Sequence, residues 1–93
     1  MSAASKRHMG RVAEAGCVIC KRLGLGNTPA EVHHARDGVG SAQRNSDWIT
    51  MGLCPEHHRG SSGIHGMGTR AFERTYKTTE LALVAETLEA IYG

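Results

Sequence analysis

The sequence has few aromatic residues and is rich in glycine. One Trp, two Tyr and one Phe are its aromatic residues, whereas 12 of its 93 residues are glycine. A chain of this length buries only about 60% of the surface that it exposes when unfolded, and such domains are often marginal without a disulfide or a metal. The length also excludes two-domain enzymes, barrels and doubly wound sheets. We therefore expect one domain, residues 1–93, that needs a source of stability besides its apolar core.

Long apolar runs are also lacking. No stretch approaches the roughly 18 consecutive apolar residues of a membrane span, and no apolar run follows Lys6 and Arg7 as in a secretory signal. We therefore expect a soluble, cytoplasmic protein. The three cysteines are an odd number, and a reducing cytoplasm does not preserve disulfides, so metal binding is the better use of these thiols.

A strong charge of either sign is missing. The net charge is +2, which does not by itself indicate nucleic-acid binding. The charge is unevenly placed, because residues 1–70 hold nine Lys and Arg against five Asp and Glu, whereas residues 71–93 hold two against four. The basic part also holds every Cys and every His.

Hydrophobic spacing and turn residues predict a small α+β fold. Residues 31–35 are short enough for a strand, and residues 48–53 are rich in β-formers, so two strands joined by a long polar loop are predicted. Such a loop in a small domain is often functional. Leu81, Val84, Leu88 and Ile91 recur at helical spacing and predict the clearest helix. The expected elements are a helix at 5–15 ended by Gly16, a turn or knuckle at Cys17–Cys20, strands at 31–35 and 48–53, the loop 36–47, a short helix from Pro55, and helical segments at about 69–92 with Thr69 as a cap.

Four residues form a metal-ligand pattern. Cys17-x2-Cys20 is followed after 33 residues by Cys54-x2-His57. Each x2 spacing lets one tight turn present two side chains to one ion, and three thiolates with an imidazole match the tetrahedral shell of structural zinc. The alternative is that the cysteines are small buried apolar residues and His57 is a surface residue. We favour a zinc site, because two such half-motifs rarely coincide by chance.

The remaining histidines predict a second site. His33 and His34 are adjacent on a predicted strand, so their side chains point to opposite faces. His58 is rotated by about 100° from the zinc ligand that precedes it on the helix, and therefore faces away from the zinc. His65 follows after six further residues. A divalent cation can thus be held by His33, His58 and His65, which leaves His34 free as a base.

Other readings of these histidines remain open. His33 and His34 can be ordinary surface or core-edge residues. His65 can contact a phosphate or be an inert loop residue, and His8 receives no role. Arginines near the motifs can bind backbone phosphates, although a solvated basic surface is the alternative for each. These candidates are Arg36, Arg44, Arg59 and Arg70.

Taken in order, the motifs resemble those of a known family. They are Cys17-x2-Cys20, Val32-His33-His34, Asp47 before a strand, Leu53-Cys54-Pro-Glu-His57-His58 and Gly63-Ile-His65. This series resembles the HNH, or ββα-metal, nucleases, in which a hairpin and a helix enclose one catalytic cation. It is most similar to the phage recombination-enhancement type, whose nuclease depends on a host recombinase. The resemblance covers about residues 8–92, with the specific motifs within 17–65.

The resemblance implies a role for each matching residue. His33 and His58 bind the catalytic ion, His34 is the general base, and His65 completes the ion site. A middle residue, usually Asn in the family, steadies the long loop, and its counterpart here is Asp47 or Asn45, of which we favour Asp47. The separation of His58 and His65 is longer than the usual three residues of the family.

These observations lead to a functional hypothesis. We expect a zinc-stapled ββα core flanked by N- and C-terminal helices. The expected activity is hydrolysis of DNA phosphodiester bonds with little sequence specificity. The expected cofactors are structural Zn²⁺ and one catalytic divalent cation, Mg²⁺, Mn²⁺, Ni²⁺ or Zn²⁺. DNA is the expected partner, a host or phage recombination or packaging protein is a candidate partner, and the expected compartment is the cytoplasm of a bacterium or phage-infected host. The alternatives are a non-catalytic zinc module that binds nucleic acid and a zinc-stabilised protein-interaction domain.

Overall fold

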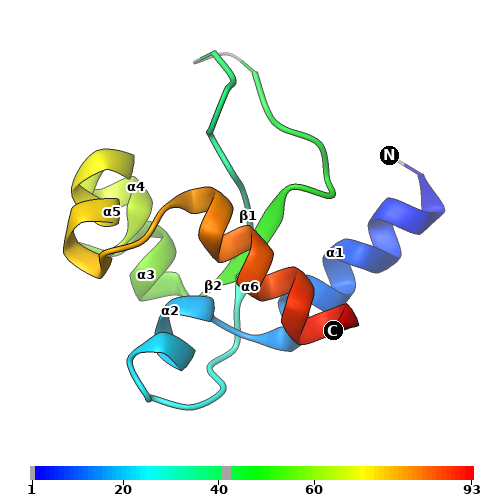
Figure 1. Cartoon of the computed structure of the whole chain (residues 1–93), viewed down its shortest axis with the longest axis horizontal. Coiled ribbons are helices and arrows are strands. Elements are labelled where there is room, and N and C mark those ends of the chain that lie inside the picture. The colour runs from blue at the N-terminus through cyan, green and yellow to red at the C-terminus, as the bar shows by residue number, and fades with distance from the viewer. Residues whose placement is uncertain (1, 41–42) are drawn as a thin grey trace.

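The computed structural model describes residues 2–40 and 43–93 (Figure 1). Within these residues it contains a two-stranded sheet and six helices. In chain order these are α1 (Ala3–Ala15), α2 (Val18–Arg22), β1 (Glu31–His34), β2 (Thr50–Leu53), α3 (Pro55–Arg59), α4 (Ile64–Met67), α5 (Thr69–Tyr76) and α6 (Glu80–Tyr92). The predicted α+β class, with helices on both sides of a hairpin in the sequence, is confirmed. No helix in the described residues has the length and apolar character that crossing a membrane requires.

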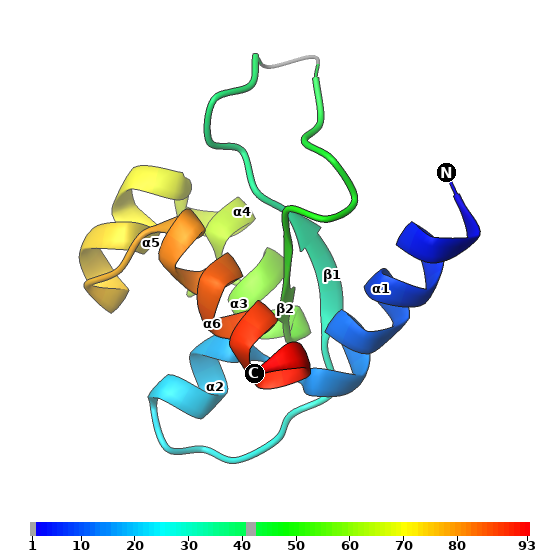
Figure 2. The same cartoon turned by 45° about the vertical axis from the view of Figure 1, so that its right-hand side comes forward.

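The two strands form an antiparallel hairpin. Glu31 pairs with Leu53 at one end, and His34 pairs with Thr50 at the other. Both strands are shorter than predicted, since β1 ends at His34 and β2 begins at Thr50. Beyond them, a single backbone hydrogen bond from the Ala35 N–H to the Ile49 carbonyl oxygen continues the pairing. The long connection between them projects from one end of the sheet, away from the helices (Figures 1 and 2). Residues 41 and 42 of this predicted loop lie outside the described residues.

The helices enclose the hairpin from several sides. α1 lies on one side of the strands, α3, α4 and α5 lie on the other, and α6 crosses over the sheet (Figures 1 and 2). β2 is buried along its whole length. Gly52 lets β2 approach α1 closely, since a Cβ at this position would lie 2.5 Å from the carbonyl oxygen of Gly16 and 3.0 Å from that of Val12. A side chain there would push α1 away from the sheet.

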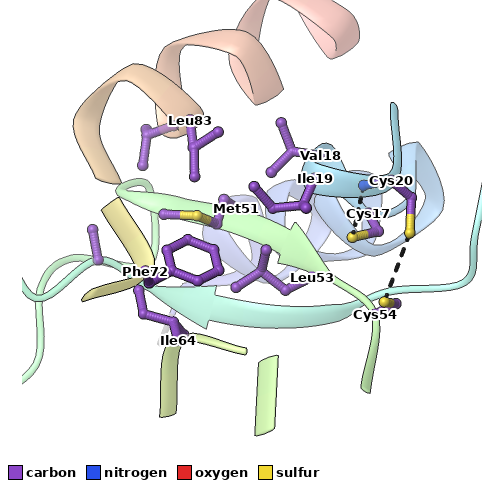
Figure 3. Close-up of a cluster of buried hydrophobic side chains, with 12 residues drawn as sticks. Cys17, Val18, Ile19, Cys20, Met51, Leu53, Cys54, Ile64, Phe72 and Leu83 are labelled. Atoms are coloured by element: carbon purple, nitrogen blue, oxygen red, sulfur yellow. Dashed lines mark hydrogen bonds between the residues drawn. The ribbon is translucent and has the colours of Figure 1, made fainter. Parts of the chain in front are cut away.

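A compact core links the sheet to α2, α5 and α6. Ile19, Met51, Leu53, Phe72 and Leu83 are fully buried within it. The three cysteines gather at one end of this core, beyond Leu53 (Figure 3). Burial of each large apolar side chain contributes about 1.5–3 kcal/mol to the free energy of folding. A core with so few of them is small, so a bound metal would add substantially to the stability of the domain.

Two local predictions are wrong in detail. Cys17–Cys20 is not a bare turn, because Cys17 is the N-cap of α2 and its sulfur accepts a hydrogen bond from the Cys20 N–H. Thr69 is not a cap but the first helical residue of α5, and Gly68 is the N-cap with φ 89°. That positive φ favours glycine over any residue with a side chain.

The buried face of α6 also differs from the predicted one. Leu83 and Val84 are buried, together with Glu80 and Thr87, whereas Leu81 is 48% exposed. The helix is rotated toward Glu80 because this carboxylate enters the molecule and bonds to groups on β1 and just after it. A buried polar anchor therefore overrides the apolar spacing that the sequence suggests.

Candidate metal centres and active site

The four predicted zinc ligands lie together in the core. Cys17, Cys20, Cys54 and His57 are all buried, and their ligand atoms lie within 4.8 Å of one another. The Nδ1 atom of His57 is 3.6 Å from Cys17 Sγ, 3.5 Å from Cys20 Sγ and 3.3 Å from Cys54 Sγ. Cys20 Sγ is 3.8 Å from Cys54 Sγ. All four donors therefore converge on one point.

This donor set fits a tetrahedral zinc ion. Zn–S bonds of about 2.3 Å place two sulfurs of a tetrahedron about 3.8 Å apart, which agrees with the spacing of Cys20 and Cys54. Both half-sites use a helix start, since Cys17 caps α2 and Cys54 caps α3 with Pro55 in the first turn. Burial raises the pKa of the Cys17 thiol to about 11 in the metal-free chain. The same buried environment lowers the pKa of His57, which keeps its imidazole neutral and available to a metal.

A second cluster joins three other predicted ligands. His33 on β1, His58 on α3 and His65 on α4 offer nitrogen atoms that lie within 4.8 Å of one another. Their ring centroids are 4.7 to 5.3 Å apart. Burial, followed by the charges of His33 and His58, lowers the pKa of His65. Imidazole nitrogens are donors that suit a divalent transition metal.

A carboxylate orients each of two imidazoles in this cluster. Glu80 Oε2 accepts a hydrogen bond of 2.8 Å from His33 Nε2, and Glu31 Oε1 accepts one of 2.8 Å from His58 Nδ1. In each ring the other nitrogen is left for a ligand, as in the carboxylate–histidine–metal arrangements of known sites. Hydrogen bonds from Arg59 and then His58 lower the pKa of Glu31 to about 2, so its carboxylate stays ionised.

These two carboxylates were missed in the sequence. The position of Glu31 could have indicated its role, because it stands two residues before His33 and therefore lies on the same face of the predicted strand. Glu80 gave no such indication beyond its place at a helix start, since it lies 47 residues from His33. Inside the fold Glu80 is only 2% exposed, and its other oxygen accepts from the Arg36 backbone N–H at 2.7 Å.

A tight turn bridges the long separation between His58 and His65. The Glu56 carboxylate accepts hydrogen bonds from the backbone and the hydroxyl of Ser62. The hydroxyl of Tyr76 donates to the Ser62 carbonyl oxygen at 2.7 Å. Gly63 follows, where a Cβ would lie 2.5 Å from the Glu56 carbonyl oxygen, so α4 can start close against α3. The inserted residues thus fold into a turn that returns His65 to the cluster.

His34, at the end of β1, pairs with a residue of the long loop. Its Nε2 is 2.9 Å from Asp47 Oδ1, and the other oxygen of Asp47 accepts from the Ser5 hydroxyl at 3.2 Å. The hydrogen bond from His34 is the largest cause of a lowered pKa of Asp47. The Asn45 amide bridges the loop instead, since it donates to the carbonyl oxygens of Ala35 and Asp37 at 3.1 and 2.9 Å. Asn45, the other counterpart considered, thus bridges the loop backbone, while the Asp47 side chain ties the end of the loop to β1 and α1.

A cavity of about 240 Å³ brings the second cluster and His34 together. Its walls include His33, His34, His58 and His65, together with two of the four predicted arginines, Arg36 and Arg44. Arg59 is instead bound to Glu31 through both carboxylate oxygens. Arg70 is exposed on α5 and does not line this cavity. The structure thus places two cationic side chains beside the histidines.

His8, which the sequence left without a role, is a core residue. It is fully buried, and its ring stacks on Trp48 at 4.7 Å and on Tyr92 at 5.7 Å between centroids. Its Nδ1 is hydrogen-bonded to the Tyr92 hydroxyl at 2.8 Å. His8 therefore joins α1 to the end of α6 and to Trp48, which precedes β2.

The fold and its two clusters define a small α+β protein with a Cys₃His group suited to structural zinc and a separate three-histidine group beside a carboxylate-bound histidine. A protein-family model described as "Recombination enhancement, RecA-dependent nuclease" matches residues 1–90. The chain therefore belongs to this family of nucleases, and that part of the resemblance seen in the sequence is confirmed. No curated protein and no solved structure matches the chain.

Proposed function

We propose that the chain is a DNA endonuclease of the HNH, or ββα-metal, type, with residues 1–93 as one catalytic domain. The observation that carries this proposal is the shared cavity, which sets His34 beside the His33, His58 and His65 cluster. Family membership supports nuclease activity. The arrangement around His34 and the cluster supports the particular mechanism.

His34 is the proposed general base. Its Nε2–H donates to Asp47, so the neutral ring carries its proton on Nε2 and leaves Nδ1 as an acceptor. This tautomer is assigned from the carboxylate partner, which only accepts when ionised. Nδ1 can then take a proton from the water that attacks the phosphorus atom, and Asp47 stabilises the imidazolium that forms.

The three-histidine cluster is the proposed site of the catalytic cation. His33, His58 and His65 would hold it, and their donor set fits Mn²⁺, Ni²⁺ or Zn²⁺ better than Mg²⁺, which prefers oxygen ligands. When bound, a divalent cation neutralises charge on the phosphoryl oxygens and stabilises the leaving alkoxide. Glu80 and Glu31 fix the ring orientations of two of these histidines.

The substrate is held through its backbone in this proposal. Arg36 and Arg44 face the cavity and can bind phosphates that flank the cut. Arg36 is braced by the carbonyl oxygens of Gly40 and Gln43, which fixes its guanidinium. Phosphate contacts carry no sequence information, so we expect low sequence specificity. The Cys₃His group serves as the structural zinc site that holds α2 and α3 together.

Plasmid nicking tests the proposal. The zinc-loaded protein should nick supercoiled DNA with Mn²⁺, Ni²⁺, added Zn²⁺ or Mg²⁺, and the rate should fall by about 10²- to 10⁴-fold in His34→Ala. Far-ultraviolet circular dichroism and zinc content verify that the variant is folded. Arg36→Gln should weaken DNA binding, whereas Arg70→Gln is the matched control outside the cavity. Wild-type rates in His34→Ala would show that His34 is not the general base. DNA binding without nicking in any of these ions, both with and without RecA filaments on the DNA, would indicate a non-catalytic zinc module.

The family description also bears on partners. We propose that the natural substrate is DNA engaged by the RecA recombinase that this description names. Nicking assays with and without RecA filaments on the substrate test this point. Equal cleavage rates with and without RecA would contradict the proposed dependence on RecA, but not the proposed nuclease activity.

A further inference from the structure

A second cavity adjoins the proposed active site. It has a volume of about 380 Å³ and is lined by Ser2, Ser5 and the segment 44–48. Arg44 lines both cavities, and Asp47, which lines the second, is bonded to His34 of the first. The two cavities therefore share a wall, and a chain of nucleotides lying in one can continue into the other.

The second cavity contains an exposed aromatic ring. Trp48 remains 43% exposed although His8 stacks on its ring at 4.7 Å with an interplanar angle of 27°. His8 is itself fully buried, so it packs against the indole from the protein interior. A partly exposed tryptophan in the wall of a polar cavity offers a stacking surface to a planar ring, and base–aromatic stacking is tolerant of sequence.

The polar groups of this cavity suit a phosphate-bearing ligand. The hydroxyl oxygens of Ser2 and Ser46 accept hydrogen bonds from the Ser5 and Trp48 backbone N–H groups, which leaves each O–H able to donate. The Asp47 carboxylate is already bonded to His34 and Ser5, and its Oδ1 lies 3.9 Å from the Arg44 guanidinium. The Asp47 side chain is 16% exposed. The Arg44 side chain is 65% exposed, so the cation is the more accessible of the two charges.

We propose that this second cavity is a subsite for one unpaired nucleotide next to the phosphate that is cut. The base stacks on Trp48, the backbone phosphate lies at Arg44, and the serine hydroxyls bond to the sugar or base edge. The inference rests on the proposed nuclease function, which places the cut phosphate in the adjoining cavity. A base inside a duplex is stacked on both sides and must leave the helix to reach the indole. The subsite therefore selects unpaired or locally opened DNA.

The chain offers a direct probe of the subsite, because Trp48 is its single tryptophan. A single-stranded thymidine oligonucleotide of about ten residues, added to the zinc-loaded protein without further divalent cation, should quench tryptophan fluorescence to saturation. A blunt duplex of the same length should quench it much less. Absence of quenching by the single strand, or equal quenching by the duplex, would overturn the proposal.

Variants separate stacking from folding. Trp48→Ala should weaken binding of the labelled single strand by about 5- to 150-fold in fluorescence anisotropy, whereas Trp48→Phe retains a ring and should keep most of the affinity. Arg44→Gln should also weaken binding, and Arg74→Gln on α5 is its control, since Arg74 lines neither cavity. If the wild-type protein nicks DNA but Trp48 shows neither quenching nor loss of affinity, the subsite is wrong and the nuclease stands. If quenching and loss of affinity occur but no ion supports cleavage, even of DNA that carries RecA filaments, the subsite stands and the proposed nuclease mechanism is wrong.

Discussion

His34 and Asp47 are 13 residues apart in the sequence, on opposite sides of a long loop, and are joined by a 2.9 Å hydrogen bond between Nε2 and Oδ1. This contact fixes which nitrogen of His34 carries the proton. Ser5 holds the second oxygen of the same carboxylate from α1, so the orientation of the proposed base depends on three separate segments.

Replacing Asp47 by Asn should slow cleavage while leaving the fold intact. Asn keeps the shape of the side chain, but its amide N–H₂ can donate to Nε2 and so favour the tautomer whose Nδ1 is protonated. We expect the maximal rate of DNA cleavage to fall by about 10²- to 10⁴-fold, with metal affinity unchanged. Single-turnover cleavage at saturating metal measures this.

Asp37→Asn is the matched control for that variant. Asp37 is exposed in the same loop, and the substitution makes the same change in charge. A loss of rate in both variants would point to the charge of the loop rather than to the bond with His34. An unchanged rate in Asp47→Asn would remove Asp47 from the mechanism.

Glu80→Gln should weaken binding of the second cation. The buried carboxylate of Glu80 holds His33 Nε2, and loss of its charge reduces the basicity of the nitrogen left for a ligand. We expect the dissociation constant for Mn²⁺ or Ni²⁺ to rise by about 10- to 100-fold in isothermal titration of the zinc-loaded protein. Glu89→Gln, on an exposed position of the same helix, should have no such effect.

Removing the zinc should unfold the domain. Structural zinc in small domains contributes about 10–16 kcal/mol, which is comparable to the whole free energy of unfolding of a typical domain, about 5–15 kcal/mol. A strong chelator should therefore abolish the cooperative thermal transition in circular dichroism, and added zinc should restore it. A chelated protein that still melts cooperatively at the original temperature would show that the core alone is sufficient.

Zinc uptake should also release protons. Burial raises the pKa of Cys17 to about 11 in the metal-free chain, so this thiol is protonated at neutral pH and must lose its proton on binding. The apparent zinc affinity should therefore rise with pH between 6 and 8 in competition titrations. Titration in buffers of different ionisation enthalpy counts the protons directly, and a count of zero would contradict this account.

The sequence predicted the metal ligands better than their supports. Cys17-x2-Cys20 and Cys54-x2-His57 are local patterns, and each places two ligands by one turn, so the spacing alone predicts that each pair converges. Glu80 reaches its partner across 47 residues through the packing of α6 on the sheet, which no local pattern encodes. The apolar spacing of α6 predicted that Leu81 would be buried. The sequence did not indicate that Glu80 is buried instead, because carboxylates are rarely buried.

The stability of the protein should fall as the pH is lowered below about 6.5, and His8 should contribute to that fall. Burial, and then the charge of Arg11, lowers the pKa of His8 from its ordinary value of 6.5. Below that value the unfolded chain binds a proton that the folded chain resists, so acid favours unfolding. Protonated His8 carries N–H on both nitrogens, and its Nε2 has no hydrogen-bond partner within the described residues.

His8→Phe separates this contribution from those of His57 and His65, whose pKa values are also lowered by burial. Phenylalanine keeps the stack between Trp48 and Tyr92 but cannot titrate. We expect the free energy of unfolding to stay within about 1.5 kcal/mol of wild type at pH 7.5, and the variant to lose less stability than wild type between pH 7 and 5. Urea unfolding of the zinc-loaded proteins at each pH measures the difference. Parallel pH profiles would show that His8 does not contribute to the loss of stability in acid, because His8 is the one titrating group that the substitution removes.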